Sequence, residues 1–148
     1  MIRTDRLHII PLNYYELISR VYSHTGMVQT QEDEDNVVNY SIKPMKDEDE
    51  RGQLFYTVWV GEHNGVEVLE CGYLCPPTIH NVVEVFCYTR PEFQKKGYGT
   101  EAIKGLVRFA EAFDDIKYVC ASVAKDNKPS QKMYLKNFLS LKLLLITE

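Results

Sequence analysis

A short stretch near the middle of the chain carries the residue types that can hold a phosphate. It reads Gln94-Lys95-Lys96-Gly97-Tyr98-Gly99-Thr100 and joins a predicted strand to a predicted helix. Its glycines let the backbone fold so that several N–H groups converge, and the helix N-terminus adds the positive end of a dipole. The stretch therefore predicts a pyrophosphate-binding turn. The simpler alternative is an ordinary strand-to-helix turn that uses glycine.

Two other phosphate-binding motifs fit less well. The Walker pattern G-x4-G-K-[ST] is absent, whereas residues 97–102 match the dinucleotide fingerprint G-x-G-x-x-[GA]. In a dinucleotide-binding domain, that fingerprint follows its strand at once, and an acidic residue ends the next strand. Here eight residues separate Tyr88 from Gly97, and no acidic residue follows the next strand until Asp126. The pattern disfavours a dinucleotide site.

A carboxylate stands inside the strand that precedes the turn. Glu84 lies in the otherwise apolar segment 82–88, and alternation places it on one sheet face with Phe86 and Tyr88. A buried carboxylate is costly unless it is paired or useful. Two interpretations stay open: Glu84 is a general base, or it marks an exposed part of the strand.

The elements that must position these residues follow from hydrophobic periodicity. Alternating or β-rich runs predict strands, and apolar positions three and four apart predict helices. Strands are predicted over 6–11, 54–60, 66–74, 82–88, 116–123 and 139–146, and helices over 12–23, around 37–42, and over 97–113 and 127–136. This order predicts a single α/β (α+β) domain over residues 1–148, antiparallel early, with a parallel β-α-β crossover late.

Composition narrows the partners. The net charge of −4 argues against a nucleic acid, and no apolar run reaches the roughly 18 residues that a membrane span needs. Without a signal-peptide pattern, a cytoplasmic location is expected. Two acidic runs, 32–35 and 47–50, either attract a cationic partner or form a solvated surface. The four cysteines lack the paired spacing of zinc knuckles, so free thiols and no metal are expected.

Three segments in register resemble the GNAT N-acetyltransferase superfamily. Residues 94–99 match its [QR]-x-x-G-x-[GA] signature, 82–88 resemble its central strand, and 127–138 resemble its last helix. The opening, residues 4–12, resembles the branch that includes the ribosomal-protein N-terminal acetyltransferases. The resemblance implies the GNAT acyl-CoA N-acyltransferase fold, a mixed central sheet with splayed parallel strands flanked by helices. It also implies transfer of an acetyl group from acetyl-CoA to an amine, such as a protein N-terminus or a small, cationic amine.

The resemblance also assigns roles to individual residues. Tyr134 would protonate the departing thiolate, although it could instead only pack the helix on the sheet, and Glu84 would be the base. The residues implied to hold acetyl-CoA are Phe86, Cys87 and Tyr88 through their backbone, Gln94, Lys95, Lys96, Gly97, Tyr98, Gly99 and Thr100 around the pyrophosphate, and Asn127 and Ser130.

The chain departs from the family pattern at two places. Asn137 stands where the family usually has glycine, and asparagine also tolerates the left-handed conformation of a helix end. Only one strand fits after Phe138, where many relatives have two, so we expect part of the acceptor-side wall to be missing or to be supplied by a second subunit in a homodimer. A non-catalytic acyl-CoA-binding module and, less favoured, a dinucleotide-binding domain are the alternative functions.

Overall fold

The computed structural model describes residues 1–138 and 143–147, which form one sheet with helices on both faces. The seven strands lie in chain order across the sheet. Their bounds are β1 Ile2–Arg3, β2 His8–Pro11, β3 Val58–His63, β4 Val66–Tyr73, β5 Val82–Thr89, β6 Tyr118–Val123 and β7 Leu143–Thr147. The helices are α1 Tyr14–Tyr22, α2 Gln31–Val37, α3 Lys43–Met45, α4 Glu50–Leu54, α5 Tyr98–Glu111 and α6 Lys128–Phe138, with a π-helical segment at Val38–Ile42 and a 3-10 turn at Pro91–Phe93.

The sheet changes direction at β5. Strands β1 to β5 pair antiparallel, whereas β5, β6 and β7 pair parallel. Helix α5 crosses from β5 to β6, as a parallel connection requires. The predicted mixed sheet, with an antiparallel first part and a late parallel crossover, is confirmed.

Strands β5 and β6 stay together over only part of their length. The ladder between them runs from Val82 opposite Tyr118 to Glu84 opposite Cys120. Beyond Glu84, β5 pairs with β4 alone, and beyond Cys120, β6 pairs with β7 alone. The sheet therefore opens between the second halves of β5 and β6, which is the splay that the resemblance implied.

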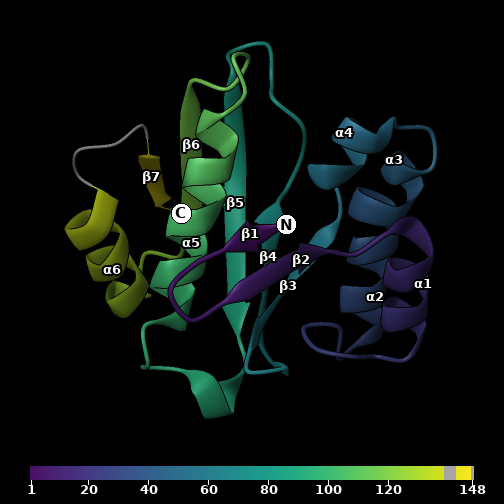
Figure 1. The fold of residues 1–148 in the computed structure, drawn as a ribbon, viewed down its shortest axis with the longest axis horizontal. Coiled ribbons are helices and arrows are strands. Elements are labelled where there is room, and N and C mark those ends of the chain that lie inside the picture. Colours follow the sequence, from purple (N-terminus) through teal and green to yellow (C-terminus); the bar gives the residue numbers. More distant parts are fainter. Residues whose placement is uncertain (139–142, 148) are drawn as a thin grey trace.

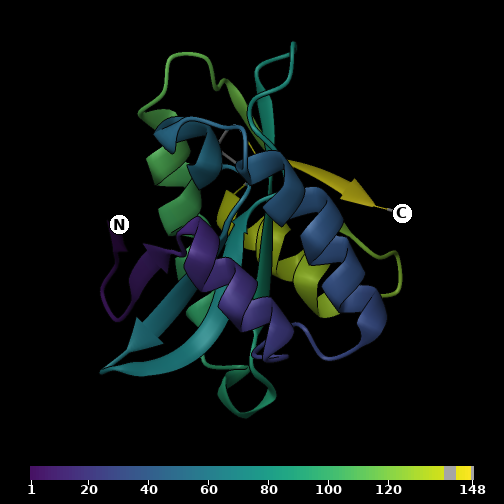
Figure 2. The ribbon, with the colours of Figure 1, turned by 90° about the vertical axis from the view of Figure 1, so that its right-hand side faces the viewer.

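The helices cover the two faces of the sheet unequally. Figure 1 shows α1 to α4 gathered on one side and α5 on the other, with α6 beside β7, and Figure 2 shows the first group face on. The larger core packs α5 on the sheet around Trp59 and Tyr73, while a smaller core under α1 and α2 includes Leu17 and Met45. The open part of β5 thus lies between two separately packed layers.

Local signals explain where the sequence-based boundaries fail. The first strand begins at His8 rather than residue 6, and the short strand β1 was not predicted. One short helix was predicted around residues 37–42, but residues 31–54 form several helical pieces, because Thr30 and Asp49 each accept a backbone N–H at a separate helix start. The strand expected from residue 54 begins at Val58, since α4 ends at Leu54 and a turn over residues 55–57 follows it. Residues 139–142 of the last predicted strand lie outside the described residues, and β7 begins at Leu143.

Candidate active site

A cleft of about 560 Å³ opens where β5 separates from β6 and meets the first turn of α5. It draws its walls from the end of β5, the turn before α5 and the start of α6. The lining residues are Cys87, Tyr88, Thr89, Phe93, Gln94, Lys95, Gly97, Tyr98, Gly99, Thr100, Asn127, Pro129, Ser130, Met133 and Tyr134. The cleft combines a polar end at the helix N-terminus with an apolar and aromatic end at α6.

The turn before α5 presents backbone N–H groups. Gly97 has φ 83° and Lys95 has φ 63°, left-handed conformations that fold the backbone back before the helix. The first intrahelical bond runs from the Glu101 N–H to the Gly97 carbonyl, over 3.1 Å. The N–H groups of residues 98–100 precede that bond and lie at the positive end of the helix dipole, an arrangement that suits an anion.

Gly99 allows α5 to start close to β5. A Cβ built at Gly99 would lie 3.3 Å from Thr89 Oγ1 and 3.8 Å from Cys87 Sγ. The Gln94 side-chain amide also donates to the Thr89 carbonyl oxygen, over 3.1 Å. Together these contacts join the turn to the end of β5.

The N-terminal segment, residues 4–6, contacts the same turn from outside the cleft. Arg6 Nη1 donates to the Lys96 carbonyl over 2.9 Å, and its guanidinium lies 4.3 Å from the Tyr98 ring centroid. Glu101 accepts hydrogen bonds from the Thr4 hydroxyl and from Arg6. Partial burial would raise the pKa of Glu101, but these bonds outweigh it and lower the pKa below its ordinary value.

The backbone of β5 presents only some of its groups to the opening. The Leu74 N–H donates to the Glu84 carbonyl, and the Arg90 N–H donates to the Val68 carbonyl, each over 2.9 Å. Because successive residues of a strand point their N–H and C=O groups to opposite sides, the even-numbered residues of β5 face β4. The groups of Val85 and Cys87 therefore face the opening. This corrects the expectation that the backbone of Phe86 and Tyr88 is available there.

Helix α6 closes the far side of the cleft. Asn127 Oδ1 accepts the Ser130 N–H over 3.3 Å and so fixes the start of the helix. One turn further, Tyr134 is buried and lines the cleft. Burial, followed by the nearby Cys87, raises the pKa of Tyr134 to about 12. The phenol therefore stays protonated at neutral pH, as a proton donor must.

Glu84 lies outside the cleft lining. It is half-buried on β5, before the opening, and the Cys120 thiol donates to its Oε1 over 3.9 Å. Burial and then the neighbouring Glu84 raise the pKa of Cys120 to about 11. Phe86 and Lys96 also do not line the cleft. The other sequence-predicted residues are brought together in it.

Sequence reasoning missed four lining residues: Thr89, Phe93, Pro129 and Met133. Helical spacing could have found the last two, since positions 129 and 133 neighbour 130 and 134 on one face of α6. Thr89 and Phe93 carry no such signal, because the turn alone places them beside the glycines.

Neither a metal site nor a membrane span emerges from the part of the chain that the structure describes. No group of three or more histidine, cysteine or acidic side chains could hold a metal ion there, and all four cysteines are free. No helix among the same residues has the length and apolar character to cross a bilayer.

Comparison with known proteins identifies what the fold resembles. Residues 8–137 match the family model described as the acetyltransferase (GNAT) domain. No curated protein matches the chain. A GNAT-family acetyltransferase from Bacillus anthracis superimposes with a TM-score of 0.61 at 18% identity, over 91% of this chain and 80% of that one.

Two further solved structures are similar. RimL, the ribosomal L7/L12 α-N-protein acetyltransferase, in complex with coenzyme A, has a TM-score of 0.65 at 14% identity, over 90% of this chain and 80% of that one. A chimera of the spermidine N-acetyltransferase SpeG from Vibrio cholerae with hSSAT has a TM-score of 0.66 at 17% identity, over 89% and 79% of the chains. At these identities the likeness establishes the fold.

Proposed function

The chain belongs to the GNAT acetyltransferase family, and we propose that it transfers the acetyl group of acetyl-CoA to a primary amine, with both bound at once. The observation that carries this proposal is the cleft itself. One opening in the sheet joins a helix N-terminus that suits a pyrophosphate to a buried tyrosine that suits a leaving thiolate.

The residues of the cleft suit the parts of acetyl-CoA in turn. The N–H groups of residues 98–100, with Lys95, would hold the pyrophosphate. The freed edge of β5 at Val85 and Cys87 would hydrogen-bond the pantetheine arm, as a sheet edge bonds an added strand. Met133 and Phe93 supply apolar surface along the way. The thioester would supply an activated acetyl group at the Tyr134 end.

Cleavage of the thioester would then use two groups of this chain. The Cys87 N–H, aimed into the opening, would donate to the thioester carbonyl oxygen as negative charge develops on it. Tyr134 would give its proton to the sulfur as the carbon–sulfur bond breaks and the carbon–nitrogen bond forms. A phenol keeps that proton at neutral pH, and its raised pKa extends the protonated range to alkaline pH.

Glu84 is the proposed base for the ammonium proton of the amine. It points to the face covered by α1 and α2, opposite the face of α5. Because it lies outside the cleft lining, proton transfer would pass through a bridging water.

Two neighbours suggest which amines to test. RimL is named as acting on a ribosomal protein and SpeG on spermidine, so an N-terminal peptide and a polyamine are both reasonable probes. Acidic residues of α2 could favour a cationic amine by long-range attraction.

The test is release of free thiol from acetyl-CoA, with mass spectrometry of the amine, for spermidine and for a basic peptide with a free N-terminus. We expect acetylated amine in equal amount to the thiol. Acetyl-CoA binding without acetylation of any amine in a broad panel would instead favour the non-catalytic binding module.

A further inference from the structure

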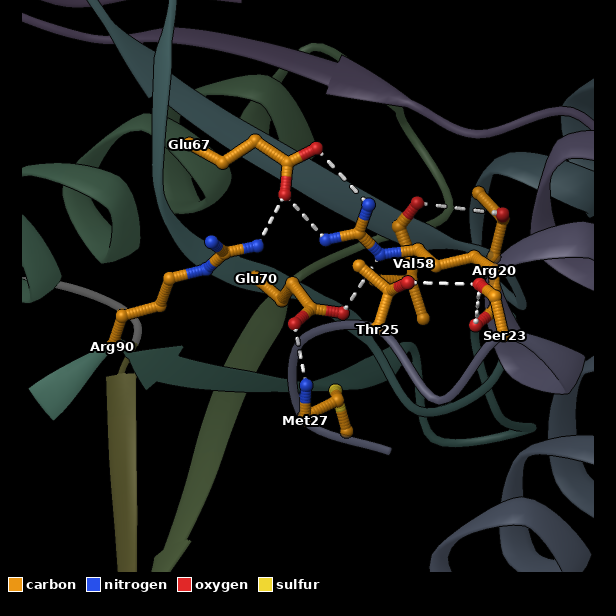
Figure 3. A network of polar contacts seen from close by, with 9 residues as sticks. Arg20, Ser23, Thr25, Met27, Val58, Glu67, Glu70 and Arg90 are labelled. Atoms are coloured by element: carbon orange, nitrogen blue, oxygen red, sulfur yellow. Dashed lines mark hydrogen bonds and ion pairs between the residues drawn. The ribbon is translucent and has the colours of Figure 1, made fainter. Parts of the chain in front are cut away.

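A partly buried polar network lies on the α1 side of the sheet, outside the cleft. Figure 3 shows its two carboxylates and two guanidinium groups: Glu67 and Glu70 from β4, Arg20 from α1 and Arg90 just after β5. The Arg20 guanidinium holds Glu67 with two bonds, of 3.0 and 2.7 Å, and reaches Glu70 over 3.3 Å. Arg90 Nη2 holds Glu67 over 2.5 Å.

Glu70 is the buried member of the network, with 2% of its surface exposed. Burial raises the pKa of its carboxyl, against the opposing effects of Arg20 and of the Met27 N–H. The hydrogen bond from Arg20 lowers the pKa of Glu67, against partial burial. Buried ion pairs add little to stability compared with apolar packing, so stability alone does not explain this network.

The second partner of Glu70 is a loop. The N–H of Met27, in the connection between α1 and α2, donates to Glu70 Oε1 over 2.6 Å. Gly26 lies directly against the same carboxylate, since a Cβ there would come within 1.7 Å of Oε1, and its φ of 72° is left-handed. Only glycine lets the loop approach Glu70 this closely.

The loop in turn reaches the cleft. Gln29, two residues after Met27, places its side-chain amide 3.4 Å from the Tyr88 hydroxyl, and Tyr88 lines the cleft. Tyr88 is also the residue opposite Glu70 in the ladder between β4 and β5. One carboxylate therefore contacts the loop and lies beside the strand that carries this wall of the cleft.

We propose that Glu70 is a positioning residue that holds the loop of residues 24–29 on β4, so that Gln29 and Tyr88 form the wall along which the amine enters. The wall lies on the α1–α2 side of the sheet, because Gln29 belongs to the α1–α2 connection and Tyr88 shares a face of β5 with Phe86, which packs on the core under α1 and α2. The entry of the amine along this wall rests on the proposed function, whereas the attachment of the loop to β4 does not.

The test compares amide hydrogen exchange in the full chain for wild type, Glu70→Ala and Glu70→Gln. In Glu70→Ala, we expect exchange in residues 24–29 to rise at least about 10-fold, because the Met27 N–H loses its acceptor. Gln keeps an acceptor oxygen of the same shape and should restore most of the protection. Glu111→Gln, an exposed residue at the end of α5, is the control.

A second variant guards against loss of folding. Gly26→Ala keeps every charge but pushes the loop away from Glu70, so it should raise the same exchange while α5 stays protected. With spermidine as the amine probe, both Glu70→Ala and Gly26→Ala should raise its KM about 10-fold and leave the KM of acetyl-CoA within about two-fold.

Unchanged exchange in residues 24–29 for Glu70→Ala would overturn the proposal, as would an equal rise across α5 or an equal loss of acetyl-CoA affinity. Failure of wild type to bind acetyl-CoA would contradict the proposed function alone, because the exchange comparison needs no ligand.

Discussion

The side-chain amide of Gln94 donates to the carbonyl oxygen of Thr89, over 3.1 Å. That carbonyl belongs to the end of β5 that faces the opening in the sheet. The first residue of the glycine-containing signature therefore joins the turn to the strand. This geometry assigns Gln94 a structural part in shaping the anion site, beside any contact with the ligand.

Removing that bond should weaken acetyl-CoA binding without unfolding the chain. For Gln94→Ala we expect an affinity loss of about 10-fold, or about 1.4 kcal/mol, in the range of one hydrogen bond. Gln94→Glu should lose at least as much, because a carboxylate cannot donate and repels phosphate. Titration calorimetry measures both, with Gln31→Ala on α2 as control. Unchanged affinity in Gln94→Ala would show that the turn keeps its shape without the hydrogen bond from Gln94 to Thr89.

Replacing the Tyr134 phenol by a phenyl ring should slow turnover while leaving binding intact. For Tyr134→Phe we expect kcat to fall about 100-fold, the lower range for a general acid, with the KM of acetyl-CoA within about two-fold. Steady-state kinetics measure both, and Tyr40→Phe, at an exposed position, is the control. A Tyr134→Phe enzyme with more than half the wild-type kcat would exclude the acid role.

The pH profile gives a separate check on Tyr134. Since its pKa is about 12, the phenol stays protonated up to about pH 10. The rate should therefore not fall on the alkaline side through loss of this proton. An alkaline limb near pH 8 that disappears in Tyr134→Phe would contradict the raised pKa.

Glu84→Gln should slow the reaction of the amine without changing the affinity for acetyl-CoA. We expect kcat/KM for the amine to fall about 100-fold at neutral pH and to recover partly as pH rises, because more of the amine is then already deprotonated. Pre-steady-state binding of acetyl-CoA should not change. The contrary result is an equal loss at every pH, which would mark Glu84 as a residue of sheet packing only.

The lowered pKa of Glu101 predicts that acid weakens the attachment of the N-terminal segment to α5. Its folded pKa is lowered from 4.5, so its contacts with Thr4 and Arg6 contribute stability above about pH 4.5 and lose it as pH falls through the lower folded value. In Glu101→Gln, we expect a loss of about 1–2 kcal/mol at pH 7, a Tm lower by roughly 3–8 °C.

Thermal melts of Glu101→Gln and wild type at several pH values would check this. The difference should narrow as pH falls below about 4.5 and through the lowered folded pKa, where the wild-type carboxylate also becomes protonated. A difference that does not narrow at any pH below 4.5 would mean that charge on Glu101 is not what holds the segment.

Local sequence signals predicted the parts of the site that are close in sequence. The spacing of Gly97 and Gly99 after a strand predicted the turn, and apolar periodicity predicted α5 and, apart from its start, the pair of strands β3 and β4. The splay of β5 from β6 is different, because nothing in the apolar pattern of 82–88 marks where pairing stops. That feature was predicted only from the family resemblance.

Long-range polar partners could not be predicted from the sequence. Arg20 and Glu70 are 50 positions apart, and a strand with Glu67 and Glu70 does not show which carboxylate turns inward. Which carboxylate is buried depends on the register between β4 and β5 and on the course of the loop at Gly26. The prediction of a single short helix within residues 31–54 failed for a local reason. The acidic runs, interpreted as solvated surface or as attracting a cationic partner, also include side chains that cap short helices.

Calorimetric titration of acetyl-CoA is the most direct test of the central claim, on wild type, Gly97→Glu and Gly65→Glu, with NAD as the control ligand. Gly97 and Gly65 have φ of 83° and 79°, so both variants carry similar backbone strain, but Gly65 lies in the hairpin away from the cleft. We expect wild type and Gly65→Glu to bind acetyl-CoA and not NAD, and Gly97→Glu to lose binding by at least about 100-fold through repulsion of the phosphates. A folded wild type that does not bind acetyl-CoA, or a Gly97→Glu variant that binds as well as Gly65→Glu, would contradict it.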